Sequence, residues 1–222
     1  MKQIVKLLGC ALLASASAGV MAQEAGSIMV KAGYAYFDPN VTSGNLSEPS
    51  LPNTKINVGA AGTILLTGTY MFTDNIAVEV YGGIPLKHDI YGAGSIQGTG
   101  VLGTVKQLPP TAFLQYHFMG ANEAFRPYLG LGVSYVHFQG ETGSAVLTAI
   151  TNPGGAPTTF QVKDTWGATP QMGFTAWFNK QWYVDASVNK SYVKTTTTLS
   201  TGQSASAKLN PMVTQFSLGY KF

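Results

Sequence analysis

Apolar and polar residues alternate along eight segments of the chain, most clearly in FSLGYKF at residues 216–222. There Phe216, Leu218, Tyr220 and Phe222 share one face, and small or polar residues share the other. A period of two predicts β-strands with one apolar face. The alternation predicts strands over residues 27–37, 63–72, 75–84, 111–118, 126–138, 165–178, 182–192 and 209–222.

The connections between these strands alternate in length. The short connections are residues 73–75, 119–124 and 179–181. The long connections are rich in Gly, Ser, Thr, Asn and Pro and are expected to be loops: residues 38–56, 86–103, 139–159 and 195–208. Short turns on one side and long loops on the other are typical of outer-membrane barrels. An even number of strands places both termini on the side of the short turns.

Composition separates a barrel from a soluble sandwich, which is the alternative for such a pattern. Only 10% of residues are charged, against about 25% in ordinary soluble domains. A sandwich would carry more charge on its outer face, whereas the polar faces here hold Gln, Thr, Ser and Gly. Aromatic residues near strand ends, such as Tyr34 and Trp182, suit an interfacial girdle. We therefore predict an all-β fold, an eight-stranded antiparallel transmembrane β-barrel with short periplasmic turns and long extracellular loops.

The N-terminal segment has the layout of a secretory signal peptide. Lys2 and Lys6 precede an apolar stretch, and Ala22 ends a cleavage site, so residues 1–22 are expected to be removed. The barrel then comprises residues 23–222 and belongs in the outer membrane of a Gram-negative bacterium. The only cysteine lies in the removed segment, which excludes a disulfide scaffold. The formal net charge of +3 is small and scattered, so we expect no nucleic-acid partner.

Five segments, in order and with compatible spacing, resemble the OmpW family of small outer-membrane proteins. They are TDNIAVEV (73–80), LPPT (108–111), FRPYLGLGVSY (125–135), DTWGATPQMGF (164–174) and LGYKF (218–222). The resemblance implies a narrow, partly hydrophobic lumen that binds or passes small hydrophobic molecules. It also implies that the barrel-insertion machinery recognises the strand that ends at Phe222. Outer-membrane lipids and lipopolysaccharide are the expected surroundings.

The narrow lumen limits what the barrel can carry. Eight strands leave room for side chains or one small ligand, so a general porin is not expected. By resemblance, the inner walls of strands three and seven carry ligand-facing residues, at positions matched by Tyr81 and Asn189, although Asn189 departs from the aromatic residue of some members. Strand parity adds four inward candidates, which could instead simply fill the interior: Leu65, Met71, Phe113 and Trp177.

Three prolines predict weak places in the barrel wall. Pro109 and Pro110 lie where the fourth strand begins, and Pro170 lies within the sixth. Proline cannot donate to the hydrogen-bond ladder, so the wall could open sideways there and release a solute into the membrane. The alternative is that these prolines only terminate strands.

Three charged residues fall on the inward face: Lys31, Glu79 and Asp185. Buried charges need partners, so we expect a salt-bridged plug that closes the periplasmic half of the lumen. A proton-linked or ion-conducting role is the other interpretation.

Two function classes remain after the motifs of catalysis are considered. His88, His117 and His137 lack the spacing of metal ligands, and no motif fixes a nucleophile beside a base. We therefore expect neither an enzyme nor a bound metal or cofactor. The chain is then either a conduit for small hydrophobic molecules or a plugged structural barrel whose extracellular loops bind partners.

Overall fold

The predicted barrel is present in the computed structural model, which describes residues 23–222. The expected signal peptide, residues 1–22, lies outside the described residues. Eight antiparallel strands close on themselves in the order β11-β12-β15-β1-β4-β5-β8-β9, and β9 pairs again with β11. These strands are β1 (Ile28–Asp38), β4 (Ala61–Met71), β5 (Ile76–Gly83), β8 (Thr111–His117), β9 (Phe125–Gly143), β11 (Thr165–Trp177), β12 (Trp182–Lys190) and β15 (Met212–Lys221).

The C-terminal strand β15 closes the barrel. It pairs with β1 on one side, where Tyr34 lies opposite Phe216, and with β12 on the other, where Ala186 lies opposite Phe216. Phe216 and Phe222 are 63% and 75% exposed on the outer wall. Pairing on both edges leaves this alternating aromatic strand without an open edge.

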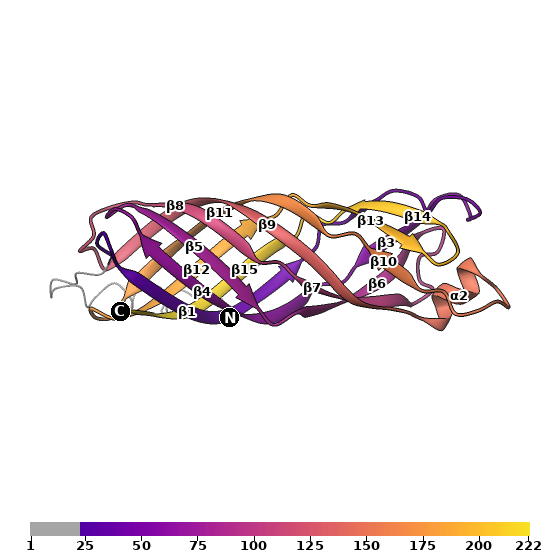
Figure 1. Ribbon diagram of the computed structural model, residues 1–222, viewed down its shortest axis with the longest axis horizontal. Coiled ribbons are helices and arrows are strands. Elements are labelled where there is room, and N and C mark those ends of the chain that lie inside the picture. The colour runs from indigo at the N-terminus through magenta and orange to yellow at the C-terminus, as the bar shows by residue number, and fades with distance from the viewer. Residues whose placement is uncertain (1–22) are drawn as a thin grey trace, which may run out of the picture.

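The outer wall of the barrel carries the apolar face of every strand, as predicted. Figure 1 shows the strands tilted across the long axis, with the C-terminus at the end that carries the short turns. Exposed apolar side chains, such as Leu131 at 65% and Leu66 at 60%, cover this wall. In water such a surface would be unfavourable, whereas lipid solvates it. In residues 23–222, no helix has both the length and the apolar character that crossing a membrane would require.

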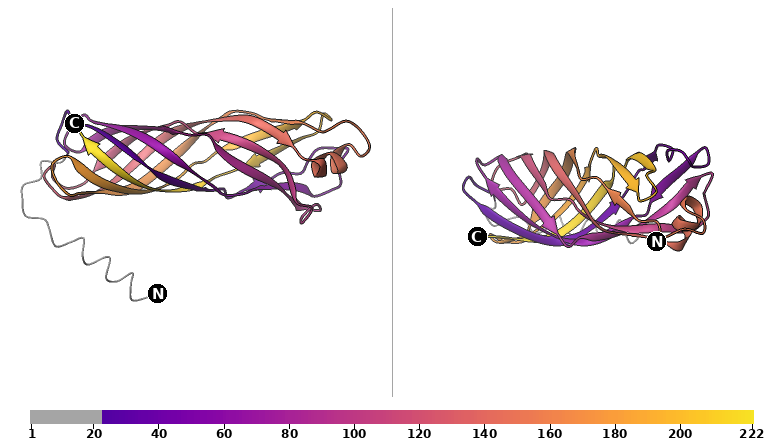
Figure 2. Two further views of the ribbon diagram at one scale, coloured as in Figure 1. Left: turned by 90° about the horizontal axis from the view of Figure 1, so that it is seen from below. Right: turned by 45° about the vertical axis from the view of Figure 1, so that its right-hand side comes forward.

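The expectation of long loops is wrong for residues 86–103 and 195–208, which fold largely into strands that prolong the barrel (Figures 1 and 2). Residues 38–56 and 139–159 keep long loop stretches beside short strand segments and one short helix. One sheet has the order β3-β6-β7-β9, and the other has the order β10-β13-β14-β2. The added elements are β2 (Thr42–Ser43), β3 (Thr54–Val58), β6 (Leu86–Gly94), β7 (Val101–Leu108), β10 (Phe160–Val162), β13 (Lys194–Leu199) and β14 (Ser204–Lys208). We call this region the outer extension.

The alternation of apolar and polar residues in the outer extension is hard to recognise, because small residues lie between its apolar positions. Its inward positions include Ile90, Leu102 and Leu199, which share one buried cluster with Ala207. Glycine, serine and threonine between them lower the apparent hydrophobicity of each hairpin. Threonine nevertheless favours strands, and hairpins that continue barrel strands have a paired edge from the start.

One short helix, α2 (Ala145–Thr151), lies at the outer tip. Ser144 caps it by accepting a hydrogen bond from the Leu147 amide at 3.2 Å. Leu147 is buried and turns toward the interior of the outer extension. The helix therefore covers part of an apolar interior.

Glycines on the inner wall make room for rings in the narrow lumen. A Cβ atom at Gly219 would lie 2.1 Å from Cζ of Tyr183, and one at Gly132 would lie 2.5 Å from Cδ1 of Phe113. Both rings therefore lie flat against a neighbouring strand that has no side chain at that point. This packing fills part of the narrow lumen with aromatic rings.

Candidate functional site

Arg126 closes the periplasmic mouth of the barrel. Its guanidinium is fully buried and donates to the carbonyl oxygens of Gln23 at 3.1 Å and Asp74 at 2.6 Å. It also donates to Oε1 of Gln23 and to the carbonyl of Phe118. The arginine thus ties the first described residue to two periplasmic turns and spans the mouth.

A compact apolar layer lies directly above this mouth. It consists of Met29, Met71, Ala77, Trp177 and Tyr183. The rings of Trp177 and Tyr183 stack with centroids 4.5 Å apart and an interplanar angle of 28°. Two of the predicted ligand residues, Met71 and Trp177, therefore lie at the periplasmic end.

A charged layer follows, and it confirms the predicted ion pairs. The Lys31 ammonium lies 2.8 Å from Oε2 of Glu79 and 2.9 Å from Oδ1 of Asp185. All three side chains are at most 3% exposed. The Tyr128 hydroxyl donates to Asp185 at 2.9 Å, and the Gln171 amide donates to Glu79 at 3.3 Å. Such partners are what buried charges require.

The charged layer also seals the lumen. The cavity beside Lys31 and Glu79 measures only about 10 Å³, which is near the minimum of about 10–15 Å³ for a single water molecule. Gln115 donates to Oε1 of Gln171 at 2.8 Å, and a ring nitrogen of His117 lies 3.1 Å from Oε1 of Gln115. These bonds extend the polar network across the barrel, so a solute has no straight path to the periplasm.

A row of hydroxyl groups joins three strands and Ser191, which directly follows β12, just above the charged layer. The oxygens of Thr111 and Ser134 lie 2.7 Å apart, and those of Ser134 and Thr169 lie 2.6 Å apart. Thr169 then donates to Ser191 at 3.0 Å. This row satisfies one hydroxyl group each of β8, β9 and β11 within the lumen.

Above this polar region, four of the predicted ligand residues come close together. Tyr81 and Phe113 have ring centroids 5.6 Å apart, and Leu65 belongs to the same buried cluster. Asn189 pairs in register with Val213, another member of that cluster. We call this cluster the middle apolar layer; its buried members are Ala35, Phe37, Leu65, Tyr81, Leu86, Phe113 and Val213.

The six predicted ligand residues thus share the inward face but do not form one site. Met71 and Trp177 lie on the periplasmic side of the charged layer, and the other four lie on its outer side. Asn189 is 2% exposed, and its amide makes a weak side-chain contact with Tyr81 but no hydrogen bond of good geometry within residues 23–222. A buried amide with so weak a partner is costly unless another group binds it.

The barrel wall is interrupted beside the middle apolar layer. The ladder between β5 and β8 ends at the pair Tyr81–Thr111, and that between β6 and β7 begins at Leu86–Gln107. Residues 82–85 and 108–110, all within the described chain, form no ladder pair with each other between these points. Pro109 and Pro110 therefore lie at a break in the wall, with Tyr81 and Leu86 just inside it.

Pro170 removes a single bond from an otherwise continuous seam. The pairs Gln171–Asn189 and Ala168–Tyr192 share one register, which places Pro170 opposite Lys190. Because proline has no N–H, this position cannot donate to β12. The seam continues on both sides, so Pro170 weakens the wall less than the double proline does.

The outer extension holds an apolar cavity of about 60 Å³. Its lining residues come from six strands, from helix α2 and from neighbouring loops, and the main ones are Ile56, Ile90, Ile96, Leu102, Leu147 and Phe160. Most of these residues lie in segments that were expected to be loops, so no site was predicted there. The alternation of Leu86, His88 and Ile90 with exposed Lys87 was the available signal.

The three histidines lie in different places. His88 is buried in the wall of the outer extension, where its Nδ1 lies 2.7 Å from the Gly59 carbonyl oxygen. Burial lowers the pKa of His88, and the Gly59 carbonyl and Asp89 oppose that shift. His117 lies in the lumen, and His137 lies on the outer rim, 2.7 Å from Oδ2 of Asp164. Within residues 23–222, no group of three or more His, Cys, Asp and Glu side chains could hold a metal ion.

The closed barrel, its apolar outer wall and its filled lumen define an outer-membrane β-barrel of the small, non-porin type. The sequence profile of the OmpW family matches residues 24–222. The chain belongs to the OmpW family, as its motifs suggested, and it is an outer-membrane protein.

Relatives of known name cover the whole chain. Outer membrane protein W of Vibrio cholerae is 36% identical over 227 residues, which are 100% of both chains. Outer membrane protein W of Escherichia coli K12 is 34% identical over 230 residues, covering 100% of this chain and 99% of the relative. The crystal structure of OprG from Pseudomonas aeruginosa matches with a TM-score of 0.83 and 29% identity, covering 91% of this chain and 99% of OprG.

Proposed function

We propose that the protein binds small hydrophobic molecules in its outer extension and releases them sideways into the outer membrane. The observation that carries this proposal is an apolar cavity above a buried charged layer. An apolar solute gains about 0.8 kcal/mol for each CH₂ group that it buries. The cavity offers this gain at the end of the barrel that faces the surroundings.

The solute must displace side chains to bind fully. A cavity of about 60 Å³ is smaller than a typical ligand pocket of roughly 300–1,000 Å³. Helix α2 contributes Leu147 and Ile150 to the lining and has only seven residues. A short helix at a tip is the element that can move with least disruption of the ladder.

The charged layer favours a sideways exit. Passage toward the periplasm would require the solute to separate Lys31 from Glu79 and Asp185, which leaves buried charges without partners. The wall break at Pro109 and Pro110 lies instead beside the middle apolar layer. A solute that moves from the cavity into this layer would thus reach lipid without crossing the charged layer.

Asn189 makes the proposed ligand class more specific. Its amide is only weakly paired, with Tyr81 of the middle apolar layer, and can bind a hydroxyl or carbonyl group of a solute. We therefore expect solutes with an alkyl or aromatic body and one polar group to bind more tightly than pure hydrocarbons. The change Asn189→Leu should remove that preference while it preserves binding of the hydrocarbon.

A cavity-filling variant tests the binding step. Ala205 lines the cavity, so Ala205→Leu should reduce binding of the fluorescent probe phenylnaphthylamine to the purified barrel. Ser204→Leu adds a similar side chain to the neighbouring position of β14, whose side chain has the opposite direction, and serves as the control. Equal loss in both variants, or in neither, would contradict binding in the cavity.

Restored ladder donors test the exit step. Pro109→Ala with Pro110→Ala should slow uptake of octane by cells that carry the variant, and adding Pro170→Ala should slow it slightly more. Pro157→Ala, outside the barrel wall, is the matched control. Unchanged uptake by cells with an intact variant barrel would contradict the sideways exit but not the binding of the solute in the cavity.

The filled lumen also supports the second candidate, a plugged barrel whose outer extension binds partners. Arg126 and the charged layer close the lumen at two levels, which suits a structural role. Comparison of hydrophobic-solute uptake by cells with and without the gene decides between the two. Equal uptake would favour the structural role.

A further inference from the structure

Two pairs of lysines face each other directly across strands on the outer surface of the outer extension. Lys87 of β6 lies opposite Lys106 of β7, and Lys194 of β13 lies opposite Lys208 of β14. All four side chains are exposed. Side chains in directly opposite positions have Cβ atoms about 4.5–5.5 Å apart, and like charges there destabilise the sheet. A repulsive pair that occurs twice calls for an anion that offsets it.

The protein itself does not supply that anion. Within residues 23–222, none of these four lysines forms an ion pair with a carboxylate. Asp164 on the same surface is engaged by His137 and the Tyr135 hydroxyl. The two pairs are therefore available to a ligand from outside the chain.

Both pairs lie just beyond the lipid-facing wall. Ile84, which is 65% exposed, precedes Lys87 by three residues along the chain. Met212, which is 48% exposed, pairs with Lys190, and the same register continues to Lys194 and Lys208 four residues further along each strand. Four residues of strand span about 13 Å, and the tilt of a barrel strand lowers the height gained.

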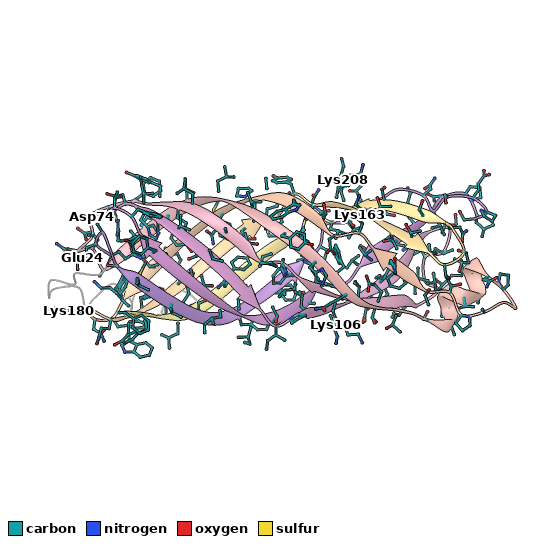
Figure 3. All side chains as sticks on the ribbon, viewed as in Figure 1. Glu24, Asp74, Lys106, Lys163, Lys180 and Lys208 are labelled. Atoms are coloured by element: carbon teal, nitrogen blue, oxygen red, sulfur yellow. The ribbon has the colours of Figure 1, made fainter. Side chains whose placement is uncertain are left out.

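Figure 3 supports a common level for the basic residues. It places Lys106 and Lys208 on opposite sides of the molecule, close to the same position along the long axis, with Lys163 beside Lys208. The other end of the molecule carries Glu24, Asp74 and Lys180. A level immediately above the apolar wall is where the headgroups of the outer leaflet lie.

We propose that the pairs Lys87–Lys106 and Lys194–Lys208 are two binding sites for the phosphate groups of outer-leaflet lipopolysaccharide. A phosphate between two ammonium groups accepts hydrogen bonds from both and cancels their repulsion. Lysine, unlike arginine, binds phosphate as a point charge, which suits a headgroup without one fixed orientation. The two sites on opposite sides would surround the barrel with bound lipid.

Neutral variants give the direct test. The full barrel in micelles is titrated with bisphosphorylated lipid A, with lipid A stripped of phosphate, with phosphatidylglycerol and with inorganic phosphate. Loss of two charges, in Lys87→Gln with Lys106→Gln or in Lys194→Gln with Lys208→Gln, should weaken binding of phosphorylated lipid A roughly thirtyfold. The matched control Lys180→Gln, at the periplasmic end, should leave that affinity unchanged.

The opposite effect on the lipid-free barrel separates binding from folding. Without lipid A, each double variant should be at least as stable to heat as the unmodified protein, because the repulsion is gone. The arginine variants at the same positions should retain binding. If a double variant fails to fold, the single variants Lys106→Gln and Lys208→Gln apply the same test, with a loss of roughly fivefold each.

Three results would overturn the proposal. The first is equal affinity of the double variants and the unmodified protein for phosphorylated lipid A. The second is the same loss with dephosphorylated lipid A, which would make the effect structural. The third is equal binding of phosphatidylglycerol or inorganic phosphate, which would remove the assignment to lipopolysaccharide.

Discussion

The barrel and the outer extension are built from one continuous wall, but the large apolar residues of β9 face outward in the barrel and inward in the outer extension. In the lower part of β9, Leu131 and Val133 face outward at 65% and 55% exposure, and Arg126 is buried inside. Further along the same strand, Val136 and Phe138 point inward as Arg126 does, and they are 2% and 6% exposed. The strand geometry does not change between these regions; the solvent outside it does.

The exchange marks the outer edge of the membrane. Tyr135 and Trp166, whose ring centroids lie 4.8 Å apart, occupy the boundary on neighbouring strands. Below them the wall meets lipid, so polar groups turn inward and satisfy one another. Above them it meets water, so the apolar core can lie inside, as in a soluble protein. The outer extension therefore has a mainly apolar interior, whereas the barrel lumen below it alternates apolar and polar layers.

The largest expected effect comes from the charged layer. Lys31→Met leaves Glu79 and Asp185 buried together without a cation, which should cost about 3–5 kcal/mol of unfolding free energy. Urea titration of the barrel in micelles measures this. Adding Glu79→Gln and Asp185→Asn to the variant should recover most of the loss. An unchanged midpoint for Lys31→Met would mean that the layer is not buried as described.

A charge on the lipid-facing wall should have the next largest effect. Leu131→Lys places an ammonium against lipid and should cost about 2–4 kcal/mol in vesicles. The matched change His137→Lys, on the same face of β9 but beyond the boundary, keeps Asp164 as a partner and should cost less than about 0.5 kcal/mol. Equal costs would place both residues in the same environment and remove the boundary at Tyr135.

A methyl group on the inner wall should have a smaller effect. Gly132→Ala would put Cβ against the Phe113 ring and should cost about 1–3 kcal/mol. Gly68→Ala is the control, because nothing lies within 4 Å of its Cβ position. The difference between the two urea midpoints measures the tightness of the middle apolar layer, and a difference near zero would indicate a loosely packed lumen.

The smallest effect concerns pH and the outer extension. Burial lowers the pKa of His88 below its ordinary 6.5 in the folded state. The neutral imidazole therefore stabilises the fold above the ordinary pKa, and this stabilisation is lost as pH falls through the folded value. The slope is at most about 1.4 kcal/mol per pH unit. Amide exchange of β6 against pH should show it, and His88→Asn should flatten the profile; an equally steep profile in the variant would assign the effect elsewhere.

The sequence predicted whether a side chain points inward or outward better than it predicted the position of that side chain along the barrel axis. Alternation alone placed Tyr81, Phe113, Met71 and Trp177 inward, and the structure confirms that parity. Their separation into two layers depends on the stagger between strands, which is a non-local property. The Lys31 ion pairs could be predicted because a filled lumen leaves buried charges only one another as partners.

The outer extension escaped prediction for a different reason. Its hairpins bury apolar residues inward and place lysines such as Lys87 and Lys106 outward, so their pattern is the reverse of that in the barrel strands. Because the outward positions of these hairpins are polar, their segments were expected to be loops. The cavity and its lining, including Ile90 and Leu199, were missed with them.

The position of a bound hydrophobic solute tests most directly whether the outer extension, and not the barrel below it, binds such molecules. Crystals of the barrel soaked with a brominated alkane would give an anomalous signal from bromine. We expect that signal among Ile90, Leu102 and Leu199 of the outer extension. Bromine found beside Trp177, below the charged layer, or on the lipid-facing wall alone would contradict it.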